Sequence, residues 1–115
     1  MDEEDKLRWH QPYIPQTLGE VFELLSVVLL SSPKFLDHRF PAQTLESVFF
    51  ALNTGLGRGK GRLGEERYRR AVELSGRIQK HFEADPEDTN GQTHQGRLLI
   101  HELEAVVRDA LRSKN

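Results

Sequence analysis

Five histidines and 18 acidic residues are the side chains of this chain that could hold a metal ion or transfer protons. Metal-binding helices usually present two ligands three or four positions apart, so that both lie on one face. His101 has one acidic neighbour at such an offset, Glu104. The pattern favours solvated or capping histidines without a cofactor, and it leaves open a metal site assembled from several elements. No two histidines have the required spacing; they are His10, His38, His81, His94 and His101.

Nucleophilic catalysis has no assembled group in the sequence either. There is no cysteine, which excludes thiol nucleophiles, thiolate zinc sites and disulfides. No serine lies in the Gly-x-Ser-x-Gly turn that exposes a catalytic serine above a sheet. The sequence therefore predicts a protein that is not an enzyme.

A glycine-rich basic segment, GLGRGKGRLG at residues 55–64, carries Arg58, Lys60 and Arg62. It contains the letters of a dinucleotide fingerprint, but that fingerprint works only between a strand and a helix, and here a helix is predicted before it. Because glycine weakens helices and strands, we expect a flexible connector. The alternative is an anion site, in which these three bases and the first amides of the next helix hold a phosphate.

A dense turn signal, DPEDTNG, occupies residues 85–91. It is not a calcium loop of the EF-hand type, because such a loop would need ligands where Pro86 and Arg97 stand. One interpretation is a capped turn whose acids are merely solvated. The other is an acidic surface that faces a basic protein partner and speeds association; its residues would be Glu83, Asp85, Glu87 and Asp88.

Apolar residues recur every three to four positions in four segments, which predicts an all-α bundle of about four helices. The capping pair Thr17 and Glu20 begins the first helix, and Gly55 is expected to end the second. Glu23 interrupts the most apolar helix, either as a buried functional acid or, as we favour, on its exposed strip. The expected helices span residues 17–31, 42–54, 65–84 and 91–112.

The length of 115 residues suits a single helical domain, residues 1–115, with residues 1–16 as an irregular arm broken by Pro12 and Pro15. The net charge of −2 gives no bulk attraction to nucleic acid or anionic membrane. The acidic N-terminus is unlike a signal peptide, and no apolar run approaches the roughly 20 residues of a membrane span. We therefore expect a cytoplasmic protein with no membrane contact.

Residues 63–107, with the acidic turn FEADPED, resemble small helical proteins of bacterial toxin–immunity loci. The resemblance implies a non-enzymatic protein that blocks a toxin by binding it, and it carries over no family residue. Our first functional interpretation is therefore a protein-binding module. The apolar breadth of helix 17–31 also suggests a homodimer that covers it. The alternative is a nucleic-acid or phosphate binder, which we favour less; its bases would be Arg58, Lys60, Arg62, Arg67, Arg69 and Arg70.

Overall fold

The computed structural model describes residues 14–31 and 44–113, and over these residues the chain forms helices and no strand. The predicted all-α class is confirmed. The irregular arm predicted at residues 1–16 lies outside the described residues except for residues 14–16, which are not helical. The helices are α2 (Leu18–Ser31), α3 (Leu45–Arg58), α4 (Lys60–Leu63), α5 (Glu65–Glu83) and α6 (Gln92–Arg112).

The first two helices begin at side-chain caps. The hydroxyl of Thr17 accepts a hydrogen bond from the Glu20 backbone N–H at 3.2 Å, as the sequence predicts, and the Glu20 carboxylate accepts one from Gln16 N–H. Thr44 and Ser47 form a reciprocal capping box at the start of α3. Such caps satisfy backbone donors that have no partner inside the helix. The second helix therefore begins at Leu45, not at residue 42 as expected.

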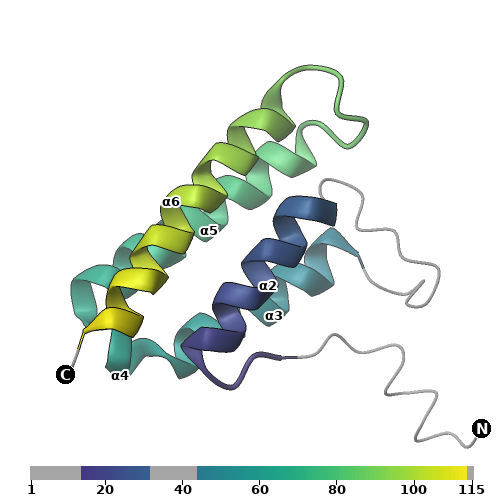
Figure 1. The fold of residues 1–115 in the computed structure, drawn as a ribbon. Helices are drawn as coiled ribbons and strands as arrows, with labels where there is room; N and C mark the ends of the chain where they lie inside the picture. The colour runs from purple at the N-terminus through teal and green to yellow at the C-terminus, as the bar shows by residue number, and fades with distance from the viewer. Residues whose placement is uncertain (1–13, 32–43, 114–115) are drawn as a thin grey trace, which may run out of the picture.

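The four long helices form a ring, in which α2 packs on α3, α3 on α5, α5 on α6 and α6 on α2. Figure 1 shows that the chain runs up and down through them in order, so neighbouring helices are antiparallel. Helices α5 and α6, with 19 and 21 residues, are longer than α2 and α3, with 14 each. The turn between α5 and α6 therefore extends past the ends of α2 and α3 (Figure 1).

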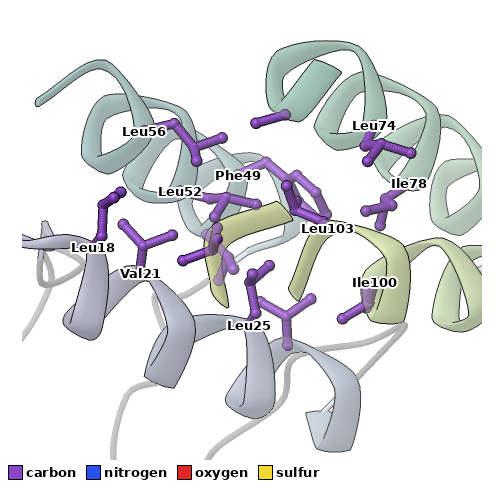
Figure 2. Close-up of a cluster of buried hydrophobic side chains, with 14 of the residues drawn as sticks. Leu18, Val21, Leu25, Phe49, Leu52, Leu56, Leu74, Ile78, Ile100 and Leu103 are labelled. Carbon is purple, nitrogen blue, oxygen red and sulfur yellow. The ribbon is translucent and has the colours of Figure 1, made fainter. Parts of the chain in front are cut away.

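The core lies along the axis of this ring and receives side chains from all four long helices (Figure 2). Phe49 of α3 and Phe82 of α5 meet edge to face, with ring centroids 6.2 Å apart, a favoured arrangement of aromatic pairs. Val72 fits the apolar spacing of its helix but is 41% exposed. The fully buried hydrophobic residues of α6 are Ile100, Leu103, Val107 and Ala110, while Leu99 and Val106 are only partly buried.

The glycine-rich segment is helical over most of its length, so the expectation of a flexible connector is wrong. Helix α3 continues past Thr54 to Arg58, and α4 follows after one residue. Two of its glycines, Gly55 and Gly59, allow close packing instead of breaking the chain. A Cβ atom on Gly55 would lie 3.0 Å from Pro15 and Val21, and one on Gly59 would lie 2.3 Å from Leu18 Cδ2. The close approach of α2 thus requires glycine, while the chain turns at Gly64, where φ is +83°.

Two alanine substitutions in this segment should have opposite effects. Gly59→Ala is expected to destabilise the fold by about 1–2 kcal/mol, because the buried Leu18 would have to move. Gly61→Ala should stabilise it by about 0.5–1 kcal/mol, since no atom lies within 4 Å of the added methyl and alanine favours the helix. Urea denaturation of both variants measures the difference, and equal stabilisation by the two would contradict the packing role.

No helix among the described residues is long and apolar enough to cross a membrane.

Glu23, which could have been a buried acid, is exposed on α2. It lies on the side of α2 that faces away from the core, as the sequence analysis favoured.

Candidate functional site

The acidic turn between α5 and α6 has an internal carboxylate at its centre. Asp85 is 1% exposed. Its Oδ1 accepts hydrogen bonds from the backbone N–H groups of Thr89, at 2.7 Å, and Asn90, at 3.2 Å. Its Oδ2 accepts one from the N–H of Thr93, at 3.0 Å, and the Thr93 hydroxyl donates to the Asp85 carbonyl. One carboxylate thereby ties the turn to the first turn of α6.

Asp85 therefore does not belong to the exposed acidic surface that was predicted from the sequence. Burial by itself raises the pKa of this carboxyl, but the backbone N–H groups of Thr93, Thr89 and Asn90 outweigh burial and hold the pKa below its ordinary value. A carboxylate kept charged by internal amides is a structural group. The sequence predicted a capped turn here because Asp85 follows directly after a helix and precedes a run of turn-forming residues.

Three of the four predicted partner-binding acids remain on the surface of this turn. Glu83 accepts a hydrogen bond from the Gln79 side chain at 3.1 Å. Asp88 lies 3.7 Å from Arg97 of α6, and Glu87 is exposed beside it. Exposed pairs of this kind contribute little to stability, so the acids can exchange partners at low cost.

The basic residues of the glycine-rich segment do not converge on one anion site. Arg62 donates to the backbone carbonyls of Ala110, at 3.5 Å, and Leu111, at 3.0 Å, which caps the end of α6. Lys60 lies over the ring of Tyr68, with its Nζ 5.1 Å from the centroid. Arg58 is exposed in the last turn of α3.

The bases of α5 that a nucleic-acid binder would use also have partners within the molecule. Arg67 donates to the carbonyl of Leu63, and Arg69 lies 3.8 Å from Glu65. Arg70 pairs with Glu102 of α6 at 3.4 Å. The acids interleave with the bases along this helix, so the structure presents no continuous basic stripe here.

An exposed apolar face runs along α3 and α5 instead. Residues three or four positions apart share one side of a helix, and the Asn53 side chain of α3 bonds Ser75 of α5 at 2.6 Å. Phe50 belongs to the same side of α3 as Asn53, and it is 62% exposed. Val72 and Gly76 belong to the corresponding side of α5, and the space around the Gly76 Cα is open. We call this surface the α3–α5 face; it comprises Phe50, Asn53, Gly57, Tyr68, Val72 and Gly76.

A shallow hollow of about 320 Å³ lies at the α4 end of this face. Tyr68 and Val72 form its apolar wall, and Lys60, Arg69 and Glu65 supply its charges. From the sequence, Lys60 and Arg69 are predicted only as separate members of a basic set. Val72 has the apolar spacing of a core residue, so nothing in the sequence marks the hollow.

Comparison with known proteins assigns no family to this arrangement. No family model, curated protein or solved structure matches the chain. The α3–α5 face and the hollow are therefore defined by the geometry of their own side chains.

None of the histidines within the described residues lines the hollow or belongs to the α3–α5 face. His81 shares a 2.6 Å hydrogen bond with Gln92, and His101 lies 3.1 Å from the largely buried Glu104. His94 is exposed on α6. In residues 14–31 and 44–113, no three acidic or histidine side chains come together as metal ligands would. His10 and His38 lie outside the described residues.

Proposed function

We propose that this chain is a non-enzymatic protein-binding module that engages its partner through the α3–α5 face. The observation that carries the proposal is the exposure of Phe50, an aromatic side chain 62% accessible on a helix whose other side forms the core. Exposed aromatic residues are enriched at the centres of protein interfaces, where each contributes a large apolar area at a low entropic cost. Val72, 41% exposed on the neighbouring helix, adds a second exposed apolar side chain to this face.

The polar groups beside this face support binding more than catalysis. Asn53 and Ser75 bond each other, and Arg69 is paired with Glu65. Neither arrangement sets a nucleophile beside a base that a third group orients, which is the geometry that activates a nucleophile. A partly apolar face with internally paired polar groups is suited to a protein partner.

A toxin domain is the partner that the resemblance of residues 63–107 to immunity proteins suggests. In this form of the proposal, the α3–α5 face contributes the apolar contact. The exposed acids Glu83, Glu87 and Asp88, at the far end of the α5–α6 hairpin, then attract a basic region of the partner.

Phe50→Ser is expected to weaken partner binding at least 10-fold, because burying a phenylalanine at an interface contributes about 2 kcal/mol. The matched control is Leu98→Ser, which changes another exposed apolar side chain, on α6 outside this face. The protein encoded beside this chain is the natural candidate partner, and isothermal titration measures its affinity for each variant. Equal affinity for the two variants would exclude the α3–α5 face as the binding surface.

A second copy of the chain is the alternative partner, favoured by α2. Val27 is 55% exposed and Leu30 is 86% exposed on this helix. Light scattering after size exclusion distinguishes the two cases. A mass of two chains that returns to one on Leu30→Ser supports a homodimer through α2, and a mass of one chain at high concentration excludes it.

A further inference from the structure

The hollow at the end of the α3–α5 face combines an apolar wall with an excess of positive charge. Its volume, about 320 Å³, is at the lower end of the range for small-ligand sites, and it suits one large side chain. Two cations, Lys60 and Arg69, border it against one carboxylate, Glu65. The aromatic ring of Tyr68 and the methyl groups of Val72 supply the surface on which an apolar group can lie.

We propose that this hollow receives an acidic amphipathic segment of the partner protein, in which an apolar side chain lies next to a carboxylate. The proposal rests on the protein-binding function proposed above and names the chemistry of the segment that binds. The apolar side chain would lie against Tyr68 and Val72. The carboxylate would pair with Lys60 and Arg69 at the rim.

Both cations can be recruited at low cost. The pair between Arg69 and Glu65 spans 3.8 Å, with the side chains 74% and 87% exposed, so water already screens it and little is lost when Arg69 turns to a partner. The Lys60 ammonium lies over the Tyr68 ring, which holds it at the rim of the hollow. Recruitment of Arg69 by the segment would leave Glu65 at the solvent-exposed margin.

A carboxylate-bearing segment fits this site better than a phosphate chain. The wall is apolar, and among the described residues only two bases line the hollow, while the neighbouring Arg62 is engaged at the end of α6. A nucleic-acid backbone would need a longer series of cations than these.

Nuclear magnetic resonance with small probes tests the proposal on the ¹⁵N-labelled full chain. Indole-3-propionate carries an apolar ring and a carboxylate, and we expect it to shift the amide signals around Lys60, Tyr68 and Val72 with a dissociation constant on the order of 1 mM. The matched control is tryptamine, which keeps the ring but carries a positive charge, and it should bind at least fivefold more weakly. Inorganic phosphate should not reproduce the shifts.

A double variant, Lys60→Gln with Arg69→Gln, removes the charges without altering the apolar wall. Both side chains are exposed, and the dispersion of the amide spectrum verifies the fold. We expect indole-3-propionate to bind the double variant at least fivefold more weakly. Equal binding of tryptamine, shifts centred elsewhere, unchanged affinity in the double variant or equal shifts with phosphate would each overturn the proposal.

This experiment can fail independently of the proposed function. If Phe50→Ser abolishes partner binding while indole-3-propionate produces no shifts at the hollow, the α3–α5 face binds protein and the acidic segment is excluded. If indole-3-propionate binds as expected but Phe50→Ser and Leu98→Ser have equal affinity for the partner, the hollow binds an apolar carboxylate, and the proposed function through Phe50 is excluded.

Discussion

Replacing Phe82 with alanine is expected to reduce the free energy of unfolding by about 3–5 kcal/mol, the cost typical of a fully buried aromatic residue. Phe82 is completely buried, and its ring packs edge-on against Phe49 of α3 and close to Gly96 of α6. The substitution would thus remove a contact shared by three helices. Because domains are stable by roughly 5–15 kcal/mol, the loss is a large fraction of the total. Urea denaturation followed by circular dichroism measures it.

The contact between Phe82 and Gly96 can be tested by combining substitutions at the two positions. A Cβ atom on Gly96 would lie 2.6 Å from Phe82 Cε1, so Gly96→Ala should destabilise the wild-type protein by about 1–2 kcal/mol. In a Phe82→Leu background the ring is absent, and the same change should become neutral or stabilising. The expected coupling energy between the two sites is at least about 1 kcal/mol.

Gly76→Ala is the matched control for this cycle. Gly76 lies in α5, and nothing is within 4 Å of an added methyl group. The change should stabilise the protein by about 0.5–1 kcal/mol in both backgrounds, since only helix propensity is altered. A Gly96→Ala penalty that persists in the Phe82→Leu background would show that the ring does not require glycine at position 96.

Asp85→Asn is expected to lower Tm by on the order of 5 °C, because the neutral amide accepts more weakly from the N–H groups of the turn and from that of Thr93 in the first turn of α6. Glu87→Gln removes one negative charge from the exposed part of the same turn and should change Tm by less than about 2 °C. Scanning calorimetry compares the two variants. Similar shifts in both would indicate that the net charge of the turn, and not the internal amides, controls stability.

The same carboxylate predicts how stability depends on pH. The pKa of Asp85 is lower in the folded state than the ordinary value of about 3.9, so its contribution is fully present above about pH 4. The contribution is lost as the pH falls below 4 through the folded-state pKa. Wild-type Tm should therefore fall more steeply than that of Asp85→Asn on acidification from pH 5 to pH 2. Parallel curves would contradict the assignment.

The helices could be predicted from the sequence because their signals are local. Apolar spacing located all four long helices, and the Thr17 cap and the break at Gly64 are set by residues within a few positions. The predicted end of the second helix at residue 54 is wrong. In the sequence, a glycine that ends a helix cannot be told from a glycine that lets another helix pack closely against it. The neighbours of Gly55 and Gly59 are Pro15, Val21 and Leu18, some 35 to 40 positions earlier in the chain.

The candidate site was predicted less well, because exposure depends on how each helix is rotated in the bundle. Val72 fits the apolar spacing of α5, but in the bundle it is 41% exposed. Phe50 lies outside the apolar stripe of its own helix, and that departure was the one signal in the sequence for an exposed aromatic. Asp85 differs from the exposed Glu83 and Glu87 in being buried among backbone amides that donate to it, and no residue spacing reveals that environment.

The ring order of the helices has a consequence for synthesis on the ribosome. Three of the four contacts in the ring join long helices that follow one another along the chain. The fourth contact, between α2 and α6, joins helices separated by most of the described chain. Because translation proceeds from the N-terminus, α2 emerges long before the helix that completes its burial. Val21, Leu25 and Val28 are fully buried in the finished fold, so we expect the nascent chain to leave them partly exposed until α6 has left the exit tunnel.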